Sequence, residues 1–285
     1  MFEKLLAVSA KILLVMLILG IILTAYLYLE NSMVAMTQYG IYSEKIPAAF
    51  NNYSIVLISD HHNSNNIKKV TQKVEEIKPK IIVIAGDSIN MHDENHSNAL
   101  MLAEHLMKIA PVYFTSGNHE TWSGNENDFL DSLKSSGVTV LNNTITTITY
   151  KNSEINLIGF KDVVYSDDNM RKDILDNELN ALYNKVENKD LFNILVFHKA
   201  NLFDWVSNYP FDLVLSGHLH GGQINLPIIK EHMLSTRFLT KKYSKGYYRK
   251  GNCQMVVSGG TEKNFKRPRI FNPPEVIEVV LKPLD

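Results

Sequence analysis

The sequence is poor in cysteine and has no excess of charge of either sign. Its single cysteine, Cys253, excludes an intrachain disulfide and a cysteine-rich zinc module, so any metal ion must be held by His, Asp, Glu or Asn. Lys and Arg number 29 and Asp and Glu 30, for a net charge of −1. Because the chain has no excess of positive charge to attract a polyanion, specific nucleic-acid binding is not expected.

A long uncharged run, residues 12–29, lies near the N-terminus. It is just long enough to cross a hydrocarbon core about 30 Å thick. Tyr26 and Tyr28 lie where an interfacial aromatic belt is expected. A cleaved signal peptide is the alternative, but such peptides usually have a shorter apolar region, and the cleavage site beyond Ser32 is poor. We therefore expect one membrane anchor over residues 1–31.

The charges beside this run set the expected orientation. Lys4 and Lys11 precede its centre, whereas Lys45 follows it in the company of Glu30 and Glu44. The positive-inside rule then leaves the N-terminus in the cytoplasm. We expect a single-pass protein of the cell membrane with an extracytoplasmic catalytic domain.

The remaining chain is interpreted as a polar juxtamembrane linker, residues 32–52, and one domain, residues 53–285, since about 250 residues suffice for a single core. The first part alternates strand and helix, which implies a parallel α/β sheet covered by helices. Residues 138–160 are rich in Thr, Ile and Val and predict antiparallel strands of a second sheet. The other predicted strands are 55–59, 81–85, 112–115, 194–197, 213–215, 255–258 and 276–281, and the predicted helices are 67–77, 96–109 and 173–186.

Five predicted strands run directly into residues that bind metal ions. Each cluster alone is a weak signal, because an Asp after a strand is usually a cap or turn residue and a lone His is usually structural. Together they indicate a site, because sites form at the carboxyl ends of strands and because two buried carboxylates repel unless cations neutralise them. The clusters are Asp60-His61-His62, Gly86-Asp87-Ser88-Ile89-Asn90, Gly117-Asn118-His119-Glu120, His198 and Gly217-His218-Leu219-His220.

The ordered motifs Asp-x-His, Gly-Asp-x-x-Asn, Gly-Asn-His-Glu, His and Gly-His-x-His, over residues 54–220, resemble those of the calcineurin-like metallophosphoesterases. Gly-His-Leu-His-Gly-Gly-Gln (217–223), Ser-Gly-Gly (258–260) and Arg-Ile-Phe-Asn-Pro-Pro-Glu (269–275) resemble the membrane-associated bacterial branch. That branch includes cell-wall-associated phosphoesterases and UDP-diacylglucosamine pyrophosphatase-type enzymes. The resemblance implies a two-sheet α/β/β/α sandwich, here preceded by one transmembrane helix.

The resemblance also implies a dinuclear centre. One divalent ion would be held by Asp60, His62, Asp87 and His220, and the second by Asp87, Asn118, His198 and His218, with Asp87 as the bridge. This nitrogen and oxygen donor set without thiolate suits Mn²⁺, Fe or Zn²⁺. His119 resembles the general acid that protonates the leaving oxygen. The implied reaction is hydrolysis of a phosphodiester or pyrophosphate bond by metal-activated hydroxide, with a membrane or cell-envelope substrate such as a phosphorylated lipid.

Asn90 departs from the family pattern, in which relatives carry an Asp that orients the acidic histidine. Asn90 carries no charge, so either its pair with His119 is weaker than an Asp–His pair, or Asp93 or another carboxylate substitutes for the missing Asp. His61 is expected to lie outside the metal ligands, because the Asp-x-His spacing selects His62.

The basic run 263–269 is interpreted either as a solvated loop or as a site in which Arg269 holds a phosphate or a lipid headgroup. Two rival functions remain open: a phosphatase or nucleotide phosphodiesterase with a cytosolic domain, and a non-catalytic metal-binding relative. The intact ligand set argues against the second.

Overall fold

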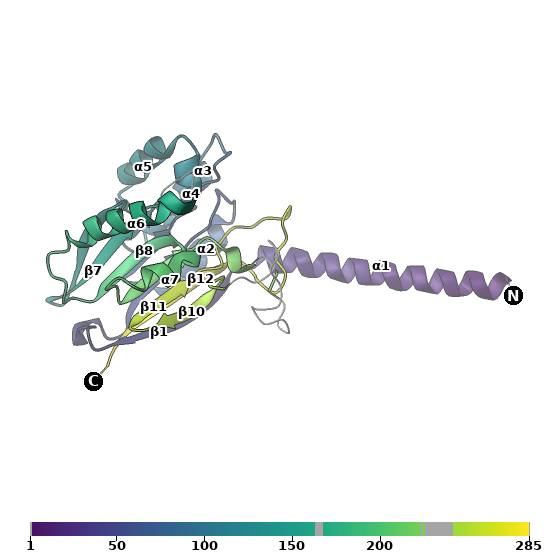
Figure 1. Cartoon of the computed structure of the whole chain (residues 1–285). Helices are drawn as coiled ribbons and strands as arrows, with labels where there is room; N and C mark the ends of the chain where they lie inside the picture. Colours follow the sequence, from purple (N-terminus) through teal and green to yellow (C-terminus); the bar gives the residue numbers. More distant parts are fainter. Residues whose placement is uncertain (1, 163–167, 223, 226–241, 285) are drawn as a thin grey trace.

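The structure, a computed structural model, describes residues 2–162, 168–222, 224–225 and 242–284. In this part of the chain two six-stranded sheets lie face to face, with helices on their outer faces (Figure 1). The strand order is β1-β12-β2-β3-β4-β5 in the first sheet and β10-β11-β9-β8-β7-β6 in the second. The expected α/β/β/α sandwich is confirmed.

The elements are bounded as follows. The first sheet contains β1 (Ala35–Ser43), β2 (Tyr53–Ile58), β3 (Ile81–Ala85), β4 (Val112–Thr115), β5 (Thr139–Val140) and β12 (Glu275–Pro283). The second contains β6 (Thr144–Tyr150), β7 (Ser153–Phe160), β8 (Asn193–Lys199), β9 (Leu213–Gly217), β10 (Gly246–Lys250) and β11 (Cys253–Val257). The helices are α1 (Phe2–Ser32), α2 (Ile67–Ile77), α3 (Ser97–Met107), α4 (Asn118–Trp122), α5 (Glu126–Ser135), α6 (Asp168–Tyr183) and α7 (Phe203–Val206), with 3-10 turns at Ala48–Phe50, Ala200–Leu202 and His220–Gly222.

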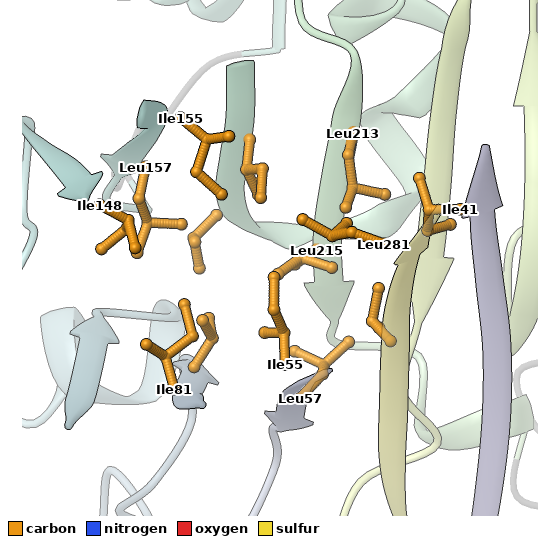
Figure 2. Packing of buried hydrophobic residues seen from close by; sticks show 14 of the residues in the cluster. Ile41, Ile55, Leu57, Ile81, Ile148, Ile155, Leu157, Leu213, Leu215 and Leu281 are labelled. Carbon is orange, nitrogen blue, oxygen red and sulfur yellow. The ribbon is translucent and has the colours of Figure 1, made fainter. Parts of the chain in front are cut away.

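The core between the sheets is built from alternate residues of facing strands. Ile55 and Leu57 of β2 point toward Leu213 and Leu215 of β9, and all four are fully buried (Figure 2). The intervening Val56 and Ile58 pack on the other face, against α2 and α3. Both faces of β2 are thus covered, which explains why the strand is a continuous apolar run. Burying each such side chain contributes about 1.5–3 kcal/mol.

The pairing directions match most of the sequence predictions. β2, β3 and β4 are parallel, as are β7, β8 and β9, and β6 and β7 form an antiparallel hairpin. β5 differs, because this two-residue strand pairs in parallel with β4 and not with the hairpin. The carboxyl ends of the central strands therefore lie along one edge of the sandwich, where the candidate ligands follow them.

The prediction that residues 32–52 are a linker is wrong for β1. This strand pairs in parallel with β12 along its whole length, from Ala35 opposite Glu275 to Ser43 opposite Pro283. An edge strand with one exposed face shows no apolar run, and its partner lies about 240 residues away in sequence, so no local pattern reveals the pairing. The chain enters the sheet almost directly after α1.

Helix α1 projects away from the sandwich (Figure 1). The most apolar 18-residue stretch within Lys4–Ser32 has a mean hydropathy of 2.8, and among the described residues this is the one helix long and apolar enough to cross a membrane. A signal sequence near an N-terminus passes the same test. Length and composition thus suggest membrane anchoring without setting the orientation.

Candidate metal centre

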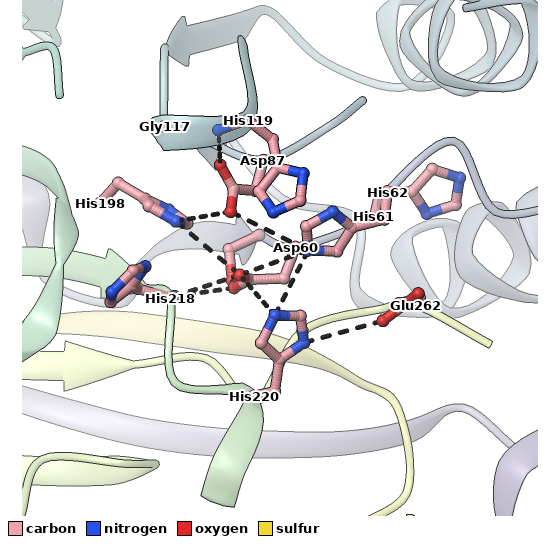
Figure 3. A network of polar contacts seen from close by, with 12 residues as sticks. Asp60, His61, His62, Asp87, Gly117, His119, His198, His218, His220 and Glu262 are labelled. Atoms are coloured by element: carbon pink, nitrogen blue, oxygen red, sulfur yellow. Dashed lines mark hydrogen bonds and ion pairs between the residues drawn. The ribbon is translucent and has the colours of Figure 1, made fainter. Parts of the chain in front are cut away.

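The structure brings the predicted ligands together at the carboxyl ends of β2, β3, β4, β8 and β9 (Figure 3). Three groups of side chains each offer donor atoms that lie within 4.8 Å of one another. Asp87 and His62 each belong to two of these groups, so the groups form one continuous cluster. The groups are Asp60–His62–His220, His62–Asp87–His119 and Asp87–His198–His218.

The donor atoms converge at short distances. Asp87 Oδ2 lies 3.0 Å from His198 Nε2 and 3.9 Å from His62 Nε2. His220 Nε2 lies 3.3 Å from His62 Nε2 and 3.4 Å from Asp60 Oδ1. Five buried or half-buried polar side chains thus face one small volume, an arrangement that contributes nothing to an apolar core.

The backbone that carries these side chains is unusual. Asp60, His62, Asp87, His218 and His220 all have a positive φ, between 48° and 81°. Left-handed backbone costs a non-glycine residue about 1–3 kcal/mol and collects at functional sites. The surrounding sheets must stabilise this geometry, which aims each side chain into the cluster.

The electrostatics of the cluster favour a bound cation. Burial lowers the pKa values of His62, His218 and His220 to about 3, so these imidazoles are neutral and can act as ligands. Burial also lowers the pKa of His198, but the carboxylates of Asp87 and Asp60 outweigh it and raise this pKa to about 10. The two carboxylates therefore attract positive charge strongly.

Two further observations fit a metal ion. His198 Nδ1 donates to the carbonyl of Ala85 at 2.7 Å, which directs Nε2 toward Asp87. Such a hydrogen bond behind the ring is typical of metal-ligating histidines. The side-chain oxygen of Asn118 is buried and has no hydrogen-bond partner among the described residues, as expected of an oxygen whose partner is a cation. The residues fit a divalent metal centre.

Two glycines let the ligand loops approach each other. A Cβ on Gly117 would lie 2.3 Å from Asp87 Oδ1, and a Cβ on Gly86 would lie 2.6 Å from the backbone nitrogen of Gly117. Gly86 also has a φ of +78°. Only glycine fits this contact between the loops after β3 and β4.

Glu120 has a role that sequence reasoning missed. It is fully buried, and its carboxylate accepts the N–H groups of Asp87 (2.8 Å), Ser88 (2.6 Å), Ile89 (3.1 Å) and Gly117 (2.8 Å). Hydrogen bonds to a charged group contribute about 1.5–3 kcal/mol each. Glu120 therefore fixes the loop that carries Asp87. The Gly-Asn-His-Glu motif was the available signal, but nothing local showed where its Glu pointed.

Glu262 was also missed. Its Oε2 lies 3.8 Å from His220 Nδ1, and its backbone N–H donates to the carbonyl of Asp60 at 3.0 Å. At 3.8 Å the contact with His220 is not a hydrogen bond, unlike the one between His198 and the carbonyl of Ala85. No signal in the sequence marked Glu262, because it lies beyond the motifs in a segment of mixed polar residues.

His119 lies at the edge of the cluster, with its ring centroid 4.4 Å from that of His62. Its Nδ1 accepts the backbone N–H of Met91 at 3.1 Å, whereas Asn90 Oδ1 accepts the N–H of His92. Asp93 accepts a hydrogen bond from Asn63 and does not replace the expected carboxylate. The sequence suggested Asn90, Asp93 or another carboxylate as the group that orients His119. In the structure, the backbone amide of Met91 makes this hydrogen bond.

His61 and Arg269 lie outside the cluster. His61 Nδ1 is 3.0 Å from the hydroxyl of Thr261, consistent with its expected place beyond the ligands. Arg269 is fully buried, and its guanidinium donates to the carbonyl of Gly259 at 2.5 Å. The interpretation as a solvated residue is therefore wrong for Arg269, whose Nε and Nη2 are buried without a hydrogen-bond partner among the described residues. Gln223, a residue of the resembling motif, lies outside the described residues.

The sequence pattern of the calcineurin-like phosphoesterase family matches residues 53–222, which include every candidate ligand. The chain belongs to this family. It is accordingly a metal-dependent phosphoesterase, and its Asp and His clusters are the candidate ligands of the divalent metal centre.

Curated relatives of this calcineurin-like phosphoesterase include bacterial proteins that match most of its length. The uncharacterized metallophosphoesterase YkuE of Bacillus subtilis is 28% identical over 90% of this chain and 88% of its own. Phosphodiesterase YaeI of Escherichia coli is 27% identical over 73% and 74%. UDP-2,3-diacylglucosamine pyrophosphatase LpxG of Chlamydia trachomatis is 24% identical over 87% and 89%.

Proposed function

We propose that the protein hydrolyses a phosphodiester or pyrophosphate bond of a membrane or cell-envelope substrate, with two divalent ions as cofactors. The observation that carries this proposal is that Asp87 Oδ2 lies near ligands of both proposed sets, 3.9 Å from His62 Nε2 and 3.0 Å from His198 Nε2, which suits a carboxylate shared by two ions. The relatives named a phosphodiesterase and a diacylglucosamine pyrophosphatase support the bond type. Mn²⁺, Fe and Zn²⁺ all suit the donor set.

The proposed ligand sets are those that the family resemblance implies, and the groups Asp60–His62–His220 and Asp87–His198–His218 support them. Asp60, His62, Asp87 and His220 would hold one ion, and Asp87, Asn118, His198 and His218 the other. When bound, a pair of divalent ions activates water for in-line attack and neutralises charge on the phosphate oxygens. The chain's part is to hold the donors rigidly: Glu120 fixes the loop that carries Asp87, and the carbonyl of Ala85 accepts the hydrogen bond that orients His198.

We propose His119 as the general acid. Because its Nδ1 accepts a hydrogen bond from Met91, the neutral ring carries its proton on Nε2. The side chain is only half-buried, whereas His62 beside it is buried, so His119 lies where a substrate can reach it. It would donate the Nε2 proton to the leaving oxygen.

Removal of metal tests the proposed function directly. Bis-p-nitrophenyl phosphate, a diester, and p-nitrophenyl phosphate, a monoester, are assayed with added Mn²⁺. We expect the diester to be cleaved faster, EDTA to abolish cleavage, and Mn²⁺ in excess to restore it, because every proposed ligand serves the ions.

Sustained turnover after complete removal of metal, verified by elemental analysis, would overturn the mechanism. A protein that binds metal but cleaves neither ester would instead support the non-catalytic relative.

We further propose that residues 1–31 are an uncleaved anchor and that the catalytic domain begins close behind them. The last turn of α1 belongs to the domain: Asn31 is fully buried, and Glu30 accepts the N–H of Asn272 at 2.7 Å. Cleavage beyond Ser32 would remove these contacts.

The proposed orientation, with the catalytic domain outside the cytoplasmic membrane, rests on Lys4 and Lys11. Thiol labelling of Asn152→Cys tests it, because Asn152 is exposed on the domain whereas the native Cys253 is buried. A charged maleimide that does not cross the membrane is added to intact protoplasts and, separately, to lysed ones. We expect equal labelling of the variant in both samples. Labelling only after lysis would place the domain in the cytosol.

A further inference from the structure

The segment Thr261 to Asn272 connects the metal centre to the end of α1. At its start, the N–H of Thr261 donates to the carbonyl of Ser59, directly before the candidate ligand Asp60. At its end, the N–H of Phe271 donates to the hydroxyl of Tyr26 at 2.9 Å. One short segment therefore touches both the ligand loop and the apolar helix.

Hydrogen bonds fasten the helix end to this segment. Asn31 donates through Nδ2 to the carbonyl of Arg269 at 3.1 Å and accepts the N–H of Arg269 at 2.7 Å. Asn272 in turn donates to the carbonyl of His220 at 2.6 Å. Since Asn31 and Asn272 are both buried, these contacts hold the candidate ligand His220 in a fixed position relative to α1.

Beside these contacts lies a group of exposed and half-exposed aromatic and basic side chains. The ring of Phe265 stacks on Tyr28 at 5.7 Å and an angle of 5°, and both are about half exposed or more. Phe271 packs against Tyr26 at 5.6 Å, and Lys263 Nζ lies 5.1 Å from the centre of the Phe265 ring. We call this surface the rim; it consists of Tyr26, Tyr28, Lys263, Phe265, Lys266 and Phe271.

The position of Tyr26 and Tyr28 in α1 indicates which environment the rim faces. Both lie in the last residues of the uncharged run 12–29, which at about 1.5 Å per residue is barely as long as the hydrocarbon core is thick. If the run crosses the bilayer, Tyr26 and Tyr28 lie at its boundary, and Phe265 and Phe271, which touch them, lie there too. Aromatic rings favour this layer, and lysines beside it attract anionic headgroups.

We propose that the rim is a membrane-contact surface that rests in the headgroup layer of an anionic bilayer and fixes the metal centre beside the lipid–water boundary. This depends on the proposed anchor but not on the proposed hydrolysis. The hydrogen bonds between α1 and the domain prevent the domain from moving away from the bilayer surface. A substrate phosphate at the level of the headgroups then lies within reach of the site.

Site-specific quenching tests the proposal on the full chain in vesicles that contain an anionic phospholipid. Because the native Cys253 is buried, a fluorophore can be attached selectively after Lys266→Cys and, as a control, after Asn152→Cys. Asn152 is exposed and precedes β7, at the end of the sheet opposite the metal centre. The quencher is a phospholipid brominated close to its headgroup.

We expect several-fold stronger quenching at position 266 than at position 152, and weaker quenching at 266 when Lys263→Glu is added. Equal quenching at both positions would overturn the proposal, as would a mature chain that has lost residues 1–31. An unchanged signal with Lys263→Glu would overturn the preference for anionic lipid. Fluorescence needs no turnover, so a hydrolytically inert protein with a quenched label would refute the proposed function alone.

Discussion

Asp87→Asn is expected to remove nearly all hydrolysis and to lower the metal content of the purified protein. Asparagine has almost the same shape, and its oxygen can still accept the N–H of His119 that Asp87 Oδ1 accepts at 2.8 Å. Asparagine lacks, however, the negative charge of the Asp87 carboxylate, which belongs to two of the three donor groups. We expect kcat/KM for bis-p-nitrophenyl phosphate to fall by about 10²–10³-fold or more, the range for losing one group that stabilises transition-state charge. Elemental analysis should show fewer ions per chain.

Two further variants serve as comparisons for Asp87→Asn. Asp131→Asn removes an exposed carboxylate on α5 whose one ion-pair partner in the described part of the chain is the surface residue Lys134, and it should change neither activity nor metal content. His119→Ala should lower turnover while leaving the metal content as in the wild type, because it removes a proton donor and no proposed ligand. Full metal content in Asp87→Asn would show that the bridging role is wrong.

Glu120→Gln is expected to destabilise the domain strongly although it touches no substrate. The carboxylate accepts two N–H groups on each oxygen, from Asp87 and Gly117 on one and from Ser88 and Ile89 on the other. An amide keeps one acceptor oxygen, so two buried N–H groups lose their partner at about 1–3 kcal/mol each. We expect the free energy of unfolding to fall by about 2–6 kcal/mol in urea titrations of the detergent-solubilised chain.

A matched control for this prediction is Glu75→Gln on α2, which makes the same chemical change at an exposed position. It should stay within about 0.5 kcal/mol of the wild type. If Glu120→Gln were as mild as Glu75→Gln, the loop after β3 would be held by its own backbone and not by the carboxylate.

The candidate site was largely predictable, because the same kind of residue follows one strand after another. Asp60, Asp87, Asn118, His198 and His218 each lie at the end of an apolar strand or within a few residues after it, and parallel strands end at one edge. The supporting residues were not predictable in this way. Glu120 and Glu262 act through hydrogen bonds and contacts whose partners are defined only when separate loops meet.

The errors in the fold have a similar cause. β1 was interpreted as a linker because an edge strand with one exposed face lacks the apolar run that marks the buried β2. Arg269 was grouped with its basic neighbours, yet it is buried while Lys266 nearby is exposed. Whether a residue is buried depends on which distant segments of the chain pack over it. The pattern of charges along the sequence does not reveal these segments.

The sequence by itself determined the uncharged N-terminal run, the alternation of strands and helices, and the identity of the side chains at the strand ends. These features depend on local composition and spacing, which the chain carries before it folds. Only the tertiary structure decided that Asp87 faces His198 at 3.0 Å, that a Met91 amide holds His119, and that the end of α1 is fastened beside His220. Such contacts join residues from about 30 to more than 200 positions apart, and their geometry arises only when both sheets have packed around one core.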